Sequence, residues 1–407
     1  MSAGKRIGAV VCLGCGCTCD DIMVEITGDR IGDAERACAL GRRWFGDGRL
    51  PARILVRGAD ATLEVATARI AALLEAGPAL VYLAPGLSTE AQRAVIGLAD
   101  GLGARLDSAT ADGPAPSILA AQRRGRATAT LAELRRRADL VVFWGVDPAE
   151  RYPRYRERYI RPDATIIAVD IGSMLGPADA GERISVPPGS EAAALGVMRA
   201  AVLGRTIPDL DAGLARAAEL AGRMAHAHYV AIVHDAEPQA VADPQRAEGL
   251  IGLAQALNIP TRCALSSLRG GGNRSGADAA MTWQTGFPFA VDFGLGVPRY
   301  RPEESLSEVC SAASVVLVAG ELAGVSAALS AAFSGRAVSV IGPRASDAGP
   351  RVEVAIDTGM PGINEGGTAY RLDDVPLPLT PILAHPRAVA AVIDAVAARL
   401  AARTVAR

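Results

Sequence analysis

Five of the seven cysteines lie within the first 38 residues, which is close enough for them to bind one metal centre. Four of them give the spacing C-x2-C-x3-C-x18-C, in which two short gaps let a single loop present three sulfurs while the fourth ligand follows later in the chain. Four thiolates at this spacing suit a [4Fe-4S] cluster. The candidate ligands are Cys12, Cys15, Cys19 and Cys38.

Two other interpretations of this loop remain open. Zinc also binds four cysteines, but its sites usually contain two C-x2-C pairs, which this spacing lacks. The third interpretation is a cysteine-rich loop that holds no metal. Cys17 is the extra cysteine, and it either takes no part or replaces Cys15 or Cys19 as a ligand.

The rest of the chain alternates short apolar runs with amphipathic segments, which predicts an α/β fold with one or more mainly parallel sheets. In such sheets, ligands bind beyond the carboxyl ends of the strands. Strands are expected over 22–26, 54–56, 80–84, 140–143, 165–170, 184–186, 229–233, 315–318, 337–341 and 352–356, and helices over 60–76, 127–138, 244–257 and 386–402.

Two loops that follow predicted strands have the composition of ligand-binding turns. The first is Trp144–Pro148, and the second is the glycine-rich segment Leu268–Gly276, which contains two arginines. Backbone N–H groups and arginine charge both suit a phosphate. Neither loop is a G-x-G-x-x-G or P-loop motif, so a plain turn is the alternative for both.

Composition excludes several classes of function. The formal charge of −2 over 407 residues argues against a general nucleic-acid binder. The longest apolar runs are shorter than the ~18 residues that a membrane helix needs, and no signal peptide is evident. Clustered cysteines then favour metal binding over disulfides, and we expect a cytoplasmic protein. The four histidines form no H-E-x-x-H motif, and no Ser/His/Asp order stands out.

The chain resembles the B subunit of formylmethanofuran dehydrogenase, a short member of the molybdopterin oxidoreductase superfamily, over nearly its whole length. The most specific matching block begins at Arg269 and ends at Tyr300. The matching residues are Cys12, Cys15, Cys19, Asp20, Asp21 and Cys38, then Trp144–Arg154 with Arg158 and Tyr159, then Arg269–Gly276, Thr282–Phe293 and Pro298–Tyr300, and finally Gly366–Arg371 with Val375–Leu377.

The resemblance implies a [4Fe-4S] cluster and a tungsten or molybdenum bis-pyranopterin guanine dinucleotide. In that family the metal reduces carbon dioxide to formate, which an amidohydrolase partner condenses with methanofuran. The implied fold is a cysteine-rich cluster-type domain (1–50) plus two Rossmann-like α/β domains of the formate dehydrogenase/DMSO reductase type, one discontinuous (51–138 and 266–407) and one inserted (139–265). The implied pterin pocket contains Trp144, Gly145, Asp147, Pro148, Arg269, Gly270, Asn273 and Gly276.

The sequence departs from this family at the metal. The redox subunits carry a Cys-His pair before Gly-Pro, and that cysteine binds the metal. Here the corresponding stretch is Ser108–Pro114, with Ala111 in place of the cysteine and Asp112 in place of the histidine. Without the thiolate and its neighbouring proton carrier, we do not expect redox chemistry at a metal, nor a bound tungsten or molybdenum pterin.

The combination of these matching motifs with a missing metal-binding cysteine is most similar to the B subunit of the bacterial formyltransferase/hydrolase complex of methylotrophs. That complex transfers a formyl group through a methanofuran-like carrier and releases formate without using electrons. The resemblance implies a redox-inactive scaffold beside an amidohydrolase-type A subunit, a solenoid-type C subunit and a formyltransferase D subunit, with the [4Fe-4S] cluster optional. The alternative is an active tungsten- or molybdenum-pterin protein that interconverts carbon dioxide and formate.

Overall fold

The computed structural model describes residues 4–111, 113–237 and 245–405, and the chain forms two compact units. Unit 1 contains residues 1–112 and 270–407, and unit 2 contains residues 113–269. The sequence-based division differs, because it gives 1–50 a domain of its own and places 113–138 and 266–269 in the discontinuous domain rather than in unit 2. The segment 113–138 belongs to unit 2 since α4 (Ala115–Arg124) contributes Ala120 to the unit 2 core and the carbonyl of Ala127 accepts a hydrogen bond from Leu265 N at 2.9 Å.

Unit 1 begins with a small antiparallel sheet in the order β1-β2-β3. In β2, every second residue is buried, which matches the strand expected over 22–26. The cysteine loop connects β1 to β2, so the pairing of these two strands holds its ends together. The elements are β1 (Lys5–Val10), β2 (Ile22–Thr27), β3 (Arg30–Glu35) and α1 (Ala39–Phe45).

The main sheet of unit 1 has nine strands in the order β14-β13-β7-β6-β15-β16-β17-β4-β5. Its five central strands, β7 to β17 in that order, are parallel, whereas the pairs at both edges are antiparallel. The strands are β4 (Ile54–Val56), β5 (Ala59–Asp60), β6 (Ala79–Leu83), β7 (Arg105–Ser108), β13 (Val291–Asp292), β14 (Arg299–Tyr300), β15 (Val315–Ala319), β16 (Ala337–Gly342) and β17 (Val354–Asp357).

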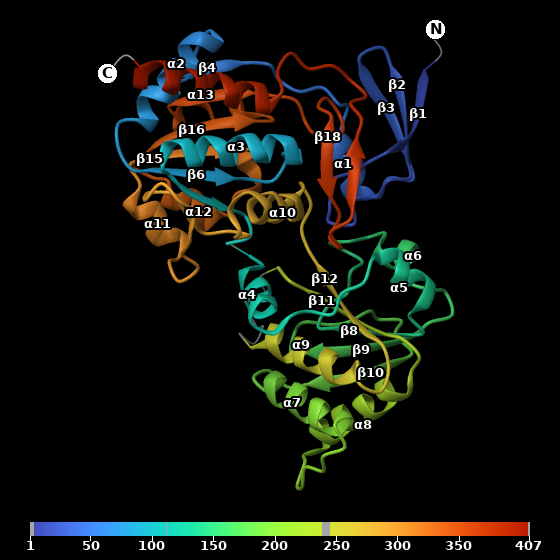
Figure 1. The fold of residues 1–407 in the computed structure, drawn as a ribbon. Helices are drawn as coiled ribbons and strands as arrows, with labels where there is room; N and C mark the ends of the chain where they lie inside the picture. Colours follow the sequence, from blue (N-terminus) through green and yellow to red (C-terminus); the bar gives the residue numbers. More distant parts are fainter. Residues whose placement is uncertain (1–3, 112, 238–244, 406–407) are drawn as a thin grey trace. The chain divides into compact units, whose positions relative to one another are not determined.

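Helices cover both faces of this sheet, because alternate strand residues face opposite ways. Val81 and Leu83 pack with α2, α3, α10 and α13, whereas Leu80 and Tyr82 pack with α11, α12 and η2. In Figure 1, α3 and α13 lie on one side of this sheet, and α11 and α12 lie on the other. The helices are α2 (Leu63–Leu74), α3 (Thr89–Leu102), α10 (Arg274–Thr285), α11 (Leu306–Ala312), η1 (Leu322–Gly324), α12 (Ala327–Ala332), η2 (Ala345–Arg351) and α13 (Val389–Val405); β18 (Gly367–Tyr370) and β19 (Pro376–Leu379) form a separate hairpin.

Unit 2 contains a five-stranded parallel sheet in the order β10-β9-β8-β11-β12, with one continuous core. Together the two units form a mixed α/β fold with several sheets, as the sequence predicts. The helix expected over 244–257 is α9, although residue 244 lies outside the described residues. The remaining elements are α5 (Leu131–Arg137), β8 (Leu140–Trp144), α6 (Tyr155–Tyr159), β9 (Thr165–Ile171), β10 (Glu182–Val186), α7 (Glu191–Val202), α8 (Ala212–His226), β11 (Val230–Asp235), α9 (Arg246–Leu257) and β12 (Cys263–Leu268).

None of the helices in the described part of the chain is both long and apolar enough to cross a membrane.

Candidate functional site

The cysteine loop is held closed by its own backbone. Cys12 N donates to the carbonyl of Cys19 at 2.8 Å, so the first and third predicted ligands lie side by side. Cys38 is the N-cap of α1, and its sulfur accepts a hydrogen bond from Gly41 N at 3.4 Å. The sulfur of Cys12 accepts one from Gly14 N at the same distance.

The four predicted ligands lie close enough to influence one another electrically. Burial raises the pKa of the Cys12 thiol, the N–H of Gly14 lowers it in part, and the charges of Cys15, Cys19 and Cys38 raise it further. Three of the four are buried, and Cys38 is half-buried. The structure therefore brings together the set that the spacing predicts.

Cys17 makes a specific contact with one predicted ligand. Its side chain is completely buried. The pKa of Cys15 is lowered, chiefly because the thiol of Cys17 donates a hydrogen bond to it; burial raises the pKa, and the backbone N–H of Cys17 lowers it. Cys17 thus lies beside a candidate ligand and favours its charged form, an arrangement that the spacing alone did not suggest.

The donor set fits an iron–sulfur cluster by its chemistry. Within the described residues, no three Cys, His, Asp or Glu side chains have a geometry that holds a single metal ion. Four neighbouring thiols, two of them accepting amide N–H groups, provide the ligands that such a cluster requires.

The predicted glycine-rich loop packs backbone to backbone against the cysteine loop. Gly272 N donates to the carbonyl of Leu13 at 2.9 Å, and the carbonyl of Gly272 accepts Gly86 N at 2.8 Å. A Cβ on Gly271 would lie 2.3 Å from the oxygen of Leu13 and 2.7 Å from Cys15 N. Only glycine permits this approach, because the neighbours are main-chain atoms.

Asn273 and Gly276, both candidates for ligand binding, serve the packing of this loop. Asn273 is buried in a left-handed conformation with a φ of 61°. Its Nδ2 donates to the carbonyl of Leu87 at 3.0 Å, and its Oδ1 accepts Tyr370 N at 2.7 Å. A Cβ on Gly276 would lie 2.2 Å from Asn273 Oδ1. The amide of Asn273 therefore binds other segments of unit 1.

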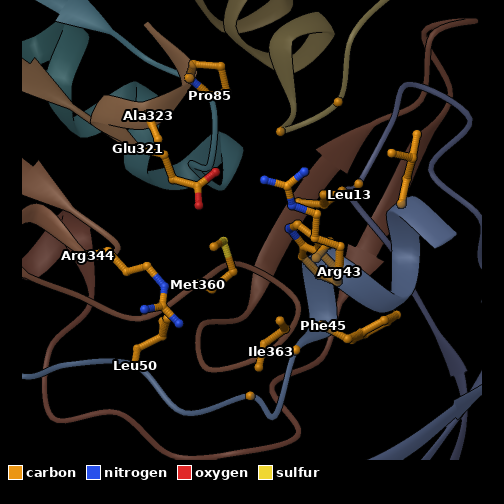
Figure 2. A pocket seen from close by; sticks show the side chains of 18 of the residues that line it. Leu13, Arg43, Phe45, Leu50, Pro85, Glu321, Ala323, Arg344, Met360 and Ile363 are labelled. Carbon is orange, nitrogen blue, oxygen red and sulfur yellow. The ribbon is translucent and has the colours of Figure 1, made fainter. Parts of the chain in front are cut away.

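A cavity of about 450 Å³ opens beside these loops in unit 1 (Figure 2). Its lining includes Leu13, Gly271 and loops that follow β6, β15, β16 and β17, so it lies beyond the carboxyl ends of parallel strands. Figure 2 shows the side chains of Glu321, Arg344 and Met360 projecting into the same space.

The lining of the cavity includes two arginines that form no ion pair within the described residues. Arg43 and Arg344 are exposed, and neither guanidinium makes a hydrogen bond or ion pair within the described residues. Arg344 has a left-handed φ of 56°, a conformation in which a side chain adds backbone strain. Burial raises the pKa of Glu321, and the charge of Arg344 lowers it in part. This combination suits an anionic ligand.

The predicted loop at Trp144 lies in unit 2, at the carboxyl end of β8. Trp144 Nε1 donates to Glu191 Oε1 at 2.6 Å, and Arg246 Nε donates to the same oxygen at 2.5 Å. Both charged residues are buried. Asp147 Oδ1 accepts Ala149 N at 2.9 Å and so closes a turn. Local sequence patterns miss the Glu191–Arg246 pair because its members are 55 residues apart.

The predicted pocket residues are thus divided between the units. Arg269 ends unit 2, and Gly270 begins the second segment of unit 1. Trp144, Gly145, Asp147, Pro148 and Arg269 belong to unit 2, whereas Gly270, Asn273 and Gly276 belong to unit 1.

The stretch expected to correspond to the metal-binding segment of the redox subunits, Ser108–Pro114, follows the carboxyl end of β7. Ser108 ends this strand, and Thr110 Oγ1 hydrogen-bonds the buried carboxylate of Asp278. Ala111 is partly buried and packs against an apolar cluster of unit 1. Asp112 lies outside the described residues.

No protein-family model matches the chain. It is 28% identical to the B subunit of the tungsten-containing formylmethanofuran dehydrogenase 2 of Methanocaldococcus jannaschii, over 95% of each chain. It is 27% identical to the corresponding protein of Methanococcus maripaludis (93% of this chain, 94% of that one) and 28% identical to the B subunit of the formyltransferase/hydrolase complex Fhc of Methylorubrum extorquens (77% and 87%). The crystal structure of the Methylorubrum extorquens complex FhcABCD with methylofuran contains a similar fold, with a TM-score of 0.71, 24% identity and coverage of 86% of this chain and 99% of that one.

Proposed function

Because this chain is a homologue of the B subunits of formylmethanofuran dehydrogenase and of Fhc, we propose that it is the B subunit of a cytoplasmic formyltransferase/hydrolase-type complex in one-carbon metabolism. Its partners are an amidohydrolase-type A subunit, a solenoid-type C subunit and a formyltransferase D subunit. These partners transfer the formyl group through a methanofuran-like carrier and release formate. The chain itself is a redox-inactive scaffold.

One observation carries the redox-inactive part of this proposal: no cysteine occurs from residue 39 to residue 262. The position expected for a metal-binding cysteine holds Ala111, whose methyl group packs in an apolar environment. A methyl group offers no lone pair to a metal. Asp112 stands where the neighbouring histidine is expected, so the proton carrier of the redox subunits is replaced as well.

The cysteine loop has a structural role in this proposal. Cys12, Cys15, Cys19 and Cys38 would hold a [4Fe-4S] cluster, with Cys17 donating a hydrogen bond to Cys15. When bound, the cluster supplies a covalent link between the cysteine loop and α1. Metal binding of this kind stabilises a small lobe, because the ligands are brought together only in the folded chain.

The test is elemental analysis of the natively purified complex, with iron, tungsten, molybdenum and zinc counted per copy of this chain. We expect about four irons and neither tungsten nor molybdenum. Stoichiometric tungsten or molybdenum would overturn the proposal. Iron should be lost in Cys12→Ser, retained in Cys17→Ser, and unchanged in the control Cys263→Ser, which alters a buried thiol of unit 2.

An active pterin-metal protein that interconverts carbon dioxide and formate is the second candidate. Arg43 and Arg344 favour it, because two cations without ion-pair partners in the described chain, beside a glycine-rich loop, suit the diphosphate of a dinucleotide. Formate oxidation coupled to a viologen dye by the metal-replete complex would support this candidate. Absence of that activity in complex shown to contain the metal would exclude it.

A further inference from the structure

One exposed aromatic side chain of unit 1 has the properties of a protein-binding anchor. Trp283, near the end of α10, is 68% exposed, although tryptophan is usually largely buried. Its neighbours Thr282 and Gln284 are also exposed and uncharged. Exposed tryptophans of this kind are enriched among the residues that dominate binding at protein interfaces.

A cation holds the ring in place from one side. The guanidinium of Arg93, on α3, lies 4.4 Å from the centre of the Trp283 ring. The contact orients both side chains before any partner arrives, which lowers the entropic cost of binding. Within the described residues, the exposed guanidinium of Arg93 interacts with the Trp283 ring alone, so its N–H groups have no carboxylate partner there.

We propose that Trp283 and Arg93 form a docking site for another protein of the complex, whose binding segment presents an apolar side chain beside a carboxylate. The apolar side chain covers the exposed part of the Trp283 ring. The carboxylate accepts hydrogen bonds from Arg93, which is the charge complement that this surface lacks. The inference rests on the proposed function, because it requires that the chain assembles with other subunits.

Trp283 and Arg93 should supply most of the binding energy, and the chain offers a matched control. Leu295, in the loop between β13 and β14, is 69% exposed, so its truncation removes an equally exposed apolar side chain from another segment. Because Trp283, Arg93 and Leu295 are all exposed, the three alanine variants should fold as the original chain does. Equal thermal midpoints of the free variants would confirm this.

The experiment measures the affinity of the full-length chain for its purified partner subunits by biolayer interferometry. We expect Trp283→Ala to weaken binding more than about 30-fold, as for an interface hot spot, and Leu295→Ala to leave it unchanged. Arg93→Ala should weaken binding and reduce its salt dependence, and Arg93→Lys should restore only part of the affinity, because lysine lacks the planar fork. Unchanged affinity in Trp283→Ala would overturn the proposal.

Hydroxyl-radical footprinting of Trp283 tests whether a partner subunit covers the ring, rather than the chain itself or a second copy of it. We expect the ring to react in the free chain and to be protected in the assembled complex. Protection already in the free monomer, or protection that appears only when the chain forms dimers, would overturn the proposal, because this chain would then cover the surface itself. Failure of the unmodified chain to bind any of its partner subunits would instead refute its proposed role in a complex.

Discussion

Asn273 connects three segments of unit 1, and its replacement by alanine should strongly destabilise that unit. The side chain is 3% exposed, donates to the carbonyl of Leu87 at 3.0 Å and to Thr89 Oγ1 at 3.2 Å, and accepts Tyr370 N at 2.7 Å. The change also places alanine at a φ of 61°, where asparagine is tolerated far better.

The expected loss follows from these contacts. A buried polar group left without its partner costs about 1–3 kcal/mol, and Asn273→Ala affects two main-chain groups, the carbonyl of Leu87 and Tyr370 N. The left-handed backbone adds about 1 kcal/mol for alanine. We therefore expect the free energy of unfolding to fall by roughly 3–5 kcal/mol, allowing for partial relaxation.

Urea denaturation of the purified chain measures this loss, and hydrogen exchange locates it. We expect the amide of Tyr370 to lose protection in Asn273→Ala. Asn273→Gly is the matched control, since it removes the same hydrogen bonds without the left-handed penalty and should be less destabilised by about 1 kcal/mol. A loss below about 1 kcal/mol in Asn273→Ala, with Tyr370 still protected, would refute the reasoning.

Three further changes have definite expected outcomes. Gly271→Ala should displace the cysteine loop, because its Cβ would meet the Leu13 oxygen at 2.3 Å, and iron counting should show reduced iron content. Arg246→Met should lower the free energy of unfolding by about 3–5 kcal/mol in urea titrations, because Glu191 is left buried without its cation. Burial, with the charges of Arg126 and Arg246, lowers the pKa of His234 to about 3, so the unfolded chain binds a proton below about pH 6.5 that the folded chain does not. Stability measured by urea titration should therefore fall by about 2 kcal/mol between pH 7 and pH 5 through this residue, and His234→Asn should lack that component.

Each of these changes has its own control. Gly97→Ala, on α3, should keep full iron content, since no atom lies within 4 Å of its Cβ. The double variant Glu191→Leu/Arg246→Met, which replaces both members of the buried pair, should lower the free energy of unfolding less than Arg246→Met alone. If His234→Asn keeps the full pH dependence of the original chain, the assignment to His234 is wrong.

The local part of the fold could be read from the sequence, because apolar periodicity reports which face of a strand or helix is buried. The run at 80–84 corresponds to β6, and the helix expected over 60–76 corresponds to α2. The cysteine spacing likewise gathers Cys12, Cys15 and Cys19 in one loop, since residues so near in sequence cannot lie far apart. The division into units could not be read in this way, because the helices within 113–138 belong to unit 2 through contacts with segments more than 100 residues later.

By itself, the sequence determined the cysteine set, the alternation of strands and helices, and the absence of a cysteine near Ala111. Only the tertiary structure decided what the predicted loops do. Asn273 proved to bind protein segments, Gly271 proved to touch the cysteine loop, and Arg43 and Arg344 proved to line one cavity. The physical reason is that periodicity and turn chemistry are properties of neighbouring residues, whereas these contacts depend on how distant segments pack, which no short pattern specifies.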